Sequence, residues 1–518
     1  MPSRIDKRNV TRRSFLRRLA AGAAGLIGAV AMEPIVTSLA RAQGAAAPAG
    51  KGKCNFLFFL ADDLGWKDLG CQGSSFYDTP NLDRLAAGGT RFTNAYAACP
   101  VCSPTRASIM TGRYPARLHL TDFIGGARRG KLIPAKYLDH LPLEEVTIAE
   151  ALKQAGYATF FAGKWHLGQK GYWPENQGFD VNMGGNDRGG PYGGNKYFSP
   201  YGNPTLPDGP PGEHLPARLA VETAKFIEAH KDGPFLAYLA FYSVHTPLMA
   251  RADLKKKYEQ RRAERNLDDQ WGDEGQSKVR LNQSHAVYGG MVDAMDQAVG
   301  HVLDALDRLK LADNTVVVFM SDNGGLSTSE ASPTSNVPLR AGKGWLYEGG
   351  IREPMIVRWP GRTKPASVCD EPVISTDFYP TMLDMAGLAA MPKQHCDGVS
   401  FAPLLRQPAG KIAPRPLFWH YPHYGNQGGS PGGAVRAGNW KLIEFYEDGR
   451  VELYNLAEDI GEKNNLAAKM PEKAAELRKM LEEWRKSVDA AMPAPNPAWG
   501  SKNSGEPRKN KQRAATEE

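Results

Sequence analysis

Long hydrophobic runs are missing from this chain. The most apolar stretch near the N-terminus extends from Leu19 to Met32, and Glu33 and Pro34 follow it directly. A membrane-spanning helix requires roughly 20 consecutive apolar residues, so this stretch is too short to serve as an anchor. The hydrophobic fraction of 42% over 518 residues is typical of a globular protein with a large core.

An excess of charge of one sign is missing as well. The full chain contains 64 basic and 56 acidic residues. Eight of the basic residues and two of the acidic residues lie within the first 42 positions. The remainder therefore has 56 basic against 54 acidic residues, a formal charge of only +2. Because proteins that bind nucleic acids depend on a strongly positive surface, we expect no nucleic acid partner.

The first 42 residues have the features of an export signal. Residues Thr11 to Leu16 (TRRSFL) resemble a twin-arginine motif, the apolar stretch follows them, and Ala40 to Ala42 is a suitable cleavage site. We therefore predict a signal over residues 1–42, the twin-arginine (Tat) export machinery as a partner, and a periplasmic or extracellular location. Residues 43–53, which are mostly small, form the expected linker.

Strand and helix patterns alternate over most of the chain. Short apolar runs typical of buried strands alternate with helical patterns bounded by proline and glycine. The expected strands are 54–60, 158–163, 235–241, 315–320 and 355–359, and the expected helices are 79–88, 147–156, 216–230 and 285–310. This order predicts an α/β fold over residues 54–413, in which a large, mixed but mostly parallel sheet is sandwiched by helices.

The composition changes near Pro414. Turn signals separate three short strand patterns, and a helical pattern follows them, over residues 417–420, 440–445, 451–454 and 471–488. We expect a smaller C-terminal subdomain with an antiparallel sheet over residues 414–490. Residues 491–518 are polar and rich in proline and lysine, which predicts a disordered tail.

The segment from Cys102 to Arg106 (CSPTR) combines features that suit an anion. Pro104 is favourable in a first helical turn, because it has no N–H group to leave unpaired there. Cys102 is therefore expected at a helix N-terminus, where free N–H groups and the helix dipole favour negative charge. Arg106 adds a fixed positive charge that can bind a tetrahedral oxyanion through two hydrogen bonds.

Acidic and amide side chains follow two of the expected strands. Asp62 and Asp63 come after the first strand, and Asp322 and Asn323 come after the strand at 315–320. Each alone can be a capping or turn residue. If the strand ends meet at one edge of the sheet, however, the three carboxylates repel one another unless a divalent cation lies between them. An oxygen-only ligand set favours Ca²⁺, with Mg²⁺ as the alternative, over zinc.

The segment Cys102 to Arg106, with Thr111-Gly112-Arg113 after it, resembles the signature of the type I sulfatases, Cys-x-Pro-Ser-Arg followed by Thr-Gly-Arg. Thr105 stands where the family usually has serine, and both residues carry a hydroxyl. The resemblance extends from about Phe56 to Ala467. It includes four further sequence segments: Gly163 to His166, Val244 to Pro247, Gly342 to Gly344, and Trp440 to Ala467.

The resemblance implies a fold related to alkaline phosphatase and an arylsulfatase-like enzyme that hydrolyses sulfate esters. Cys102 would be oxidised to formylglycine, so a formylglycine-generating or sulfatase-maturing enzyme would be a partner. The implied metal ligands are Asp62, Asp63, Asp322, Asn323 and the modified Cys102, and the implied catalytic residues are Cys102, Arg106, Lys164, His166, His245 and Lys343.

In the implied reaction the hydrated aldehyde at Cys102 attacks sulfur through one of its hydroxyls. The cation, Arg106, Lys164 and Lys343 would hold the sulfate oxygens, and His245 and Lys343 would stabilise or protonate the departing alcohol oxygen. His166 would then accept a proton from the second hydroxyl, which expels sulfate and restores the aldehyde.

Three alternatives remain open from the sequence. Cys99 and Cys102 form a C-x-x-C pair, which is often a redox or disulfide pair in an exported protein. A metal-dependent phosphomonoesterase or phosphodiesterase of the same superfamily would need a second metal cluster rich in Asp and His. A non-catalytic binder of sulfated glycans would keep Cys102 as a thiol.

The substrate is indicated only by a long polar region. Residues 171–211 are rich in Gly, Pro and Asn, without periodicity, and contain Tyr192, Tyr197 and Tyr201. Aromatic faces and amides suit a sugar, so we expect a carbohydrate sulfate ester. The highly charged segment 251–278 is expected to be a solvated excursion. Among the cysteines, Cys369 and Cys396 form the preferred disulfide, on proximity in sequence alone.

Overall fold

The computed structural model describes residues 53–500. The predicted export signal at 1–42, nearly all of the linker and residues 501–518 lie outside this range. Among the described helices, none is both long enough and apolar enough to cross a bilayer.

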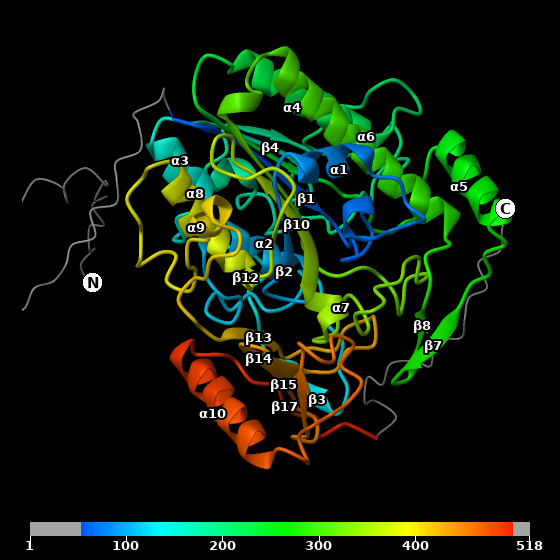
Figure 1. The fold of residues 1–518 in the computed structure, drawn as a ribbon, viewed down its shortest axis with the longest axis vertical. Coiled ribbons are helices and arrows are strands. Elements are labelled where there is room, and N and C mark those ends of the chain that lie inside the picture. Colours follow the sequence, from blue (N-terminus) through cyan, green and yellow to red (C-terminus); the bar gives the residue numbers. More distant parts are fainter. Residues whose placement is uncertain (1–52, 501–518) are drawn as a thin grey trace, which may run out of the picture. The chain divides into compact units, whose positions relative to one another are not determined.

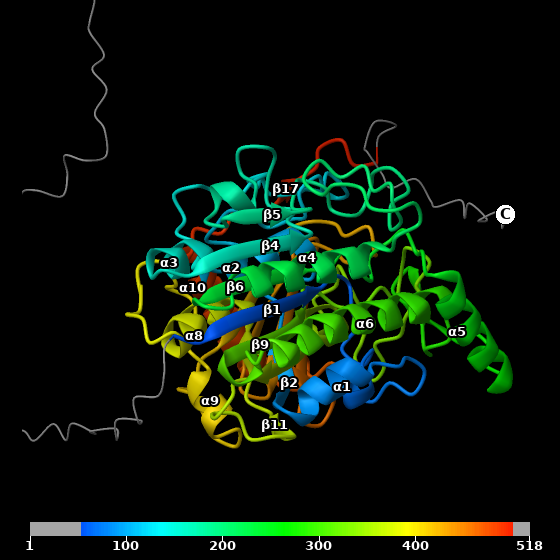
Figure 2. The same cartoon turned by 90° about the horizontal axis from the view of Figure 1, so that it is seen from above.

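A mixed sheet forms the centre of the fold (Figures 1 and 2). Its strands pair in the order β11-β2-β10-β9-β1-β6-β4-β5, with β12 also paired to β2. Figure 2 shows β5, β4, β6, β1 and β9 side by side in this order. All neighbours are parallel except for the two pairs that β10 makes with β9 and β2. The strands are β1 (Asn55–Ala61), β2 (Thr90–Tyr96), β4 (Ala158–Gly163), β5 (Val181–Met183), β6 (Phe235–Ala240), β9 (Thr315–Ser321), β10 (Arg352–Arg358), β11 (Ser367–Cys369) and β12 (Val373–Ile374).

Helices cover both faces of this sheet. Alternate residues of β1 show the two layers, because Phe58 belongs to one apolar core and Phe59 to the other. One core contains residues of α2 (Cys102–Thr111), α3 (Ile148–Gln154), α8 (Phe378–Met385) and α9 (Ala402–Arg406). The other contains residues of α1 (Pro80–Ala87), α4 (Leu215–Ala229), α5 (Ala252–Glu264) and α6 (Ala286–Arg308). Because both faces are covered, the central strands are continuous apolar runs, and the predicted α/β class is confirmed.

A separate antiparallel sheet follows toward the C-terminus, drawn in orange beside the red helix α10 in Figure 1. Its strands pair in sequence order: β13 (Leu417–Tyr421), β14 (Gly432–Ala437), β15 (Trp440–Phe445) and β16 (Val451–Asn455). Helix α10 (Pro471–Ser487) packs on it through Leu477, Leu481 and Trp484. The indole of Trp419 donates a hydrogen bond to Ala97 O, just beyond β2, at 2.8 Å, which connects this sheet to the main sheet.

A buried ion network makes a second connection between the two sheets. The ammonium of Lys441 on β15 lies 2.9 Å from a carboxylate oxygen of Glu348 and 2.9 Å from one of Glu462. Glu348 begins α7 (Glu348–Ile351), which leads into β10. All three side chains are fully buried, so the network fixes the C-terminal sheet against the main sheet.

Several elements differ from the expectations. Strand β2 alternates buried and partly buried residues, and β14 is rich in glycine, so neither has a strong apolar pattern. The charged segment 251–278 is ordered, and it contains α5 and the hairpin of β7 (Trp271–Glu274) and β8 (Ser277–Arg280). In the expected tail, β17 (Ala494–Pro495) pairs with β3 (Leu132–Ile133), so the ordered chain continues beyond residue 491.

The predicted disulfide is wrong. Cys369 is buried in β11, whereas Cys396 is exposed in a turn, and both are free thiols. The four other cysteines are free as well. Closeness in sequence failed as a guide here because β11 pairs with β2 and carries Cys369 into the apolar core.

Candidate active site

The predicted site residues converge at the carboxyl edge of the parallel strands. Asp62 and Asp63 follow β1, Lys164 follows β4, His245 lies beyond β6, and Asp322 follows β9. Since these strands are parallel neighbours, their carboxyl ends meet at one edge, which is where open α/β sheets form their sites. All of these side chains are buried.

Cys102 is the first residue of α2 and is 3% exposed. Burial raises the pKa of its thiol, although Lys164 and Lys343 oppose that rise. An unmodified thiol here is therefore protonated at neutral pH and a poor nucleophile. This environment argues against the redox interpretation of Cys99 and Cys102, which requires a reactive thiolate.

Three buried ion pairs surround the cysteine. Each joins a cationic nitrogen to a carboxylate oxygen at 2.7 Å: Lys164 Nζ to Asp62 Oδ2, Arg106 Nη2 to Asp322 Oδ2, and Lys343 Nζ to Asp63 Oδ1. Arg106 also donates from Nη1 to the carbonyl of Lys164 at 2.6 Å, which fixes the plane of its guanidinium. Each cation thus pairs with one carboxylate and offsets its charge in a buried environment.

The carboxylates respond differently to this environment. Burial raises the pKa of Asp62 well above its ordinary value, although Lys164 opposes the rise. Burial also acts to raise the pKa of Asp63, but Lys343 outweighs it and lowers that pKa. The negative charge of a third carboxylate, Asp322, also raises the pKa of Asp62.

Oxygen atoms without partners mark a place for a cation. Asp62 Oδ1 and Asn323 Oδ1 are buried and have no hydrogen-bond partner within residues 53–500. Ligand atoms of Asp62, Cys102 and Asp322 lie within 4.8 Å of one another, and so do those of Asp62, Asp63 and His245. Buried, unpaired oxygens next to like charges are costly, so the predicted ligand set fits a hard divalent cation. The nitrogen of His245 beside this set was not expected from the sequence.

The two histidines are neutral and hold defined tautomers. His166 Nε2 lies 3.1 Å from the carbonyl oxygen of Ile124, which can only accept, so Nε2 carries the proton and Nδ1 has a free lone pair. Nδ1 is buried without a partner among the described residues. Burial and Lys164 lower the pKa of His166 well below its ordinary value. By the same argument His245 carries its proton on Nδ1, 2.7 Å from Thr246 O, and burial and Lys343 lower its pKa.

A cavity of about 370 Å³ opens onto these groups. Its lining includes Cys102, His166, His245 and Lys343, together with Phe123, Ile124, Gly189, Tyr192, Thr246, Glu330, Asn426 and Gln427. Tyr192 is half-exposed, and its ring stands edge-on to His245. Of the three tyrosines expected to face substrate, only Tyr192 lines this cavity.

The other two tyrosines have structural roles. Tyr197 is fully buried, and its hydroxyl donates to the carbonyls of Tyr242 and His245 at 2.6 and 2.8 Å. Tyr201 is also buried and bonds Glu213. Tyr197 thereby fixes the loop that carries His245, which no sequence pattern indicated.

The cavity wall contains residues that the sequence did not identify. Glu330, Asn426 and Gln427 lie in polar loops without a motif, about 100 positions apart in the chain. Only the composition of the two loops could have indicated these residues, because both loops are rich in small and amide residues. Their proximity follows from the packing of the C-terminal sheet onto the main sheet.

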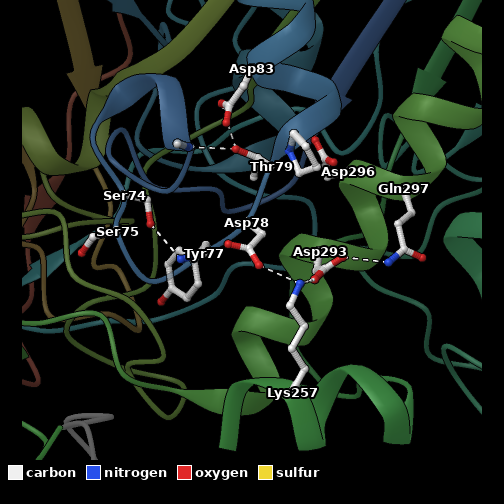
Figure 3. A pocket seen from close by; sticks show the side chains of 12 residues that line it. Ser74, Ser75, Tyr77, Asp78, Thr79, Asp83, Lys257, Asp293, Asp296 and Gln297 are labelled. Carbon is white, nitrogen blue, oxygen red and sulfur yellow. Dashed lines mark hydrogen bonds and ion pairs between the residues drawn. The ribbon is translucent and has the colours of Figure 1, made fainter. Parts of the chain in front are cut away.

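A second cavity, of about 510 Å³, lies between the start of α1 and helices α5 and α6 (Figure 3). Its acidic groups are already satisfied. Lys257 lies 2.7 Å from Asp78 and 2.6 Å from Asp293, and Asp296 accepts from the first backbone N–H groups of α1. This cavity therefore has a structural explanation, in helix capping and ion pairing.

Comparisons with known proteins agree with this geometry. The Sulfatase family model matches residues 54–388, and a model described as N-sulphoglucosamine sulphohydrolase, C-terminal, matches residues 341–487. Arylsulfatase A of Homo sapiens is 34% identical over 493 residues, which cover 85% of this chain and 89% of that protein. N-acetylgalactosamine-6-sulfatase of Homo sapiens is 33% identical over 391 residues, 71% of this chain and 68% of that protein.

A solved structure gives the same result in three dimensions. The crystal structure of Ps i-CgsB in complex with k-i-k-neocarrahexaose has a TM-score of 0.70 and 29% sequence identity, and covers 86% of this chain and 94% of its own. The chain therefore belongs to the sulfatase family of the alkaline phosphatase superfamily and is a sulfuric ester hydrolase.

Proposed function

We propose that this sulfatase hydrolyses carbohydrate sulfate esters by means of a formylglycine made from Cys102 and a divalent cation, with Ca²⁺ favoured over Mg²⁺. The observation that carries the proposal is the position of Cys102, at the N-terminus of α2, on the wall of the cavity and among three ion pairs. A thiol with a raised pKa has no evident use there, whereas a hydrated aldehyde would supply a hydroxyl nucleophile.

The cation would be held by Asp62, Asp63, Asp322 and Asn323. Their oxygen atoms, two of them buried and unpaired, support this assignment. Ca²⁺ accepts oxygen ligands in flexible geometry, which suits a set taken from two strand ends. When bound, the ion supplies positive charge that stabilises the sulfate oxygens.

The cationic side chains would bind and orient the sulfate group. Lys343, on the loop after β9, lines the cavity. Arg106 on α2 and Lys164 after β4 are not among the lining residues, and buried ion pairs with Asp322 and Asp62 hold them. Burial acts to lower the pKa of Lys164, but Asp62 outweighs it and raises that pKa, so Lys164 stays charged. Fixed positive charge in a dry site stabilises the charge that develops on the sulfate oxygens in the transition state.

Proton transfer would be divided between two sides of the cavity. His166, neutral with a free lone pair on Nδ1, is suited to accept a proton near Cys102. Lys343 carries a charge that can stabilise the departing alcohol oxygen, and we assign it this role ahead of neutral His245. His245 would help to position that oxygen.

Two features support a carbohydrate as the alcohol. The cavity wall includes the polar side chains of Thr246, Asn426 and Gln427, with Tyr192 as a half-exposed aromatic face. Ps i-CgsB, similar in sequence and fold, was crystallised with a neocarrahexaose, and another relative is named for N-acetylgalactosamine. An exported location, through the signal at residues 1–42, would give access to such polysaccharides and remains part of the proposal.

Mass spectrometry and a substrate panel test the proposal. A Cys102 peptide from purified, active enzyme is expected to be about 18 Da lighter than the cysteine form, the difference expected for formylglycine. Sulfate release from sulfated oligosaccharides is expected to exceed release from small aryl sulfates. An unmodified thiol in fully active enzyme would refute the role of Cys102. Release from aryl sulfates alone would refute the carbohydrate assignment. Fractionation of the producing cells tests export.

A further inference from the structure

Glu330 lies in the wall of the active-site cavity, on the loop that follows β9. Its carboxylate accepts three hydrogen bonds from other segments. Asn426 Nδ2 and Gln427 Nε2 each donate to Oε1 at 2.6 Å, and Thr246 Oγ1 donates to Oε2 at 3.2 Å. None of the mechanistic steps above uses this carboxylate.

The carboxylate is held by interlocked loops. Beside it, Thr328 Oγ1 donates to the carbonyl of Gln427 at 2.8 Å, and Ser329 Oγ donates to the carbonyl of Asn426 at 3.2 Å. The loop after β9 and the loop after β13 are thus bonded to each other through both side chains and backbone. A group with this many supports is pre-organised for recognition.

Glu330 has no cationic partner of its own. Within residues 53–500, no Lys, Arg or His nitrogen lies within salt-bridge distance of its carboxylate. A carboxylate offers about four acceptor positions, so three donors leave one free. Its negative charge nevertheless extends into the cavity, because it contributes to the fields at Lys343 and His245.

We infer that Glu330 determines specificity for the alcohol part of the ester: it accepts a hydrogen bond from a hydroxyl of the leaving group and disfavours a second anionic group there. This inference rests on the proposed function. It narrows the substrate class to sulfate esters whose sulfated sugar carries free hydroxyls and has no carboxylate or further sulfate within reach of Glu330.

The physical reason is a difference between the two ends of the ester. The sulfate end would lie beside Cys102 and Lys343 on the cavity wall, near the further buried cations Arg106 and Lys164, so one negative charge is favoured there. The alcohol end meets Glu330 with its acceptor position unfilled. A hydroxyl satisfies that position, whereas a second anion brings like charges together there.

The experiment measures a ratio of kcat/KM values. One pair of substrates is two sulfated disaccharides with the same sulfated sugar, joined to either a neutral sugar or a uronic acid. A second pair is two phenyl sulfates that carry either a hydroxymethyl or a carboxylate group. The wild-type enzyme is expected to prefer the neutral member of each pair by about tenfold, mostly through KM.

Glu330→Gln is expected to reduce this preference to about twofold, whereas Glu330→Asp, which keeps the charge, retains it. A merely structural role would lower the activity on both members equally and leave the ratio unchanged. Glu264→Gln, which removes an exposed charge from α5, is the matched control and should leave the ratio unchanged.

A wild-type enzyme without preference, or an unchanged ratio in Glu330→Gln, overturns the inference. Failure of the carbohydrate assignment is distinguishable, because it would leave both disaccharides uncleaved while the phenyl sulfates still report the ratio.

Discussion

Lys343 Nζ lies 2.7 Å from Asp63 Oδ1 and 2.8 Å from Asp63 Oδ2, and both side chains are buried. Asp63 also accepts a hydrogen bond from Asn323 at 2.8 Å. Lys343 follows β9 through a long loop, whereas Asp63 follows β1, so the pair joins two strand ends beneath the cavity. The charge of Lys343 is therefore held in place before any substrate arrives.

Replacing Lys343 by alanine is expected to lower kcat by roughly 10²–10³-fold, as the loss of a pre-organised donor does in other hydrolases. KM should change less, because Arg106 and Lys164 remain to bind the sulfate group. Sulfate release under saturating substrate measures the effect, and Lys343→Arg is the charge-conserving control. A kcat within tenfold of the wild-type value would contradict the assigned role.

Removal of divalent cations is expected to abolish activity and to lower the melting temperature. Without a cation, the carboxylates of Asp62, Asp63 and Asp322 repel one another in a buried site. A cation at 100 times its Kd would stabilise the fold by about 2.7 kcal/mol. Scanning calorimetry after chelation, with Ca²⁺ or Mg²⁺ restored, measures the shift. Asp62→Asn should respond much less to Ca²⁺; an equal response in both proteins would disprove this site.

Truncating Tyr192 to alanine is expected to raise KM for a sugar sulfate by about fivefold, because a stacking interaction of about 1 kcal/mol is lost. Tyr192→Phe keeps the ring and should stay close to wild type. Initial rates over a range of substrate concentrations measure both variants. Equal KM values for the alanine and wild-type enzymes would show that the exposed ring does not contact the sugar.

Lys441→Met is expected to destabilise the protein by about 3–5 kcal/mol, since it leaves Glu462 buried without its cation and removes the shorter ion pair of Glu348, which keeps Arg352 at 3.3 Å. Urea denaturation measures the free energy of unfolding. Lys479→Met removes a lysine from an exposed pair with Glu483 and should cost at most about 1 kcal/mol. A similar effect of the two substitutions would show that the buried network contributes little.

Asp122→Asn is expected to change how stability depends on pH. Burial raises the pKa of Asp122 to about 7 from its ordinary 3.8, despite hydrogen bonds from Phe123 N and Tyr421 OH. The folded state therefore holds this proton more tightly than the unfolded state. The resulting stabilisation is complete below pH 3.8 and is lost as the pH rises to about 7.

Asparagine keeps both accepted hydrogen bonds and cannot ionise. The variant should thus gain stability relative to wild type between pH 4 and 7, by on the order of 2–4 kcal/mol. His423, the nearby titratable group, has a pKa lowered by burial and stays neutral over this range. Denaturation at a series of pH values measures the difference, and a difference that is constant with pH would contradict the prediction.

The sequence alone determined the fold class and identified most of the residues that the structure brings together at the candidate site. Apolar runs such as β1 and β9 have a strong pattern because both faces of these strands are buried. The segment from Cys102 to Arg106 was recognisable because its residues act together within about one helical turn. Residues that are close in sequence form a pattern that can be seen in the sequence itself. The positions directly after two predicted strands identified Asp62, Asp63, Asp322 and Asn323 for the same reason.

Only the tertiary structure decided which distant groups meet. It placed Glu330 against Asn426 and Gln427, left Cys369 apart from Cys396, and turned Tyr197 into a support for His245. These relationships depend on the packing of the C-terminal sheet and the long loops, whose contacts join residues about 50 to 100 positions apart or more. Such contacts leave no periodicity in the chain, because each is fixed by shape and hydrogen bonding in space.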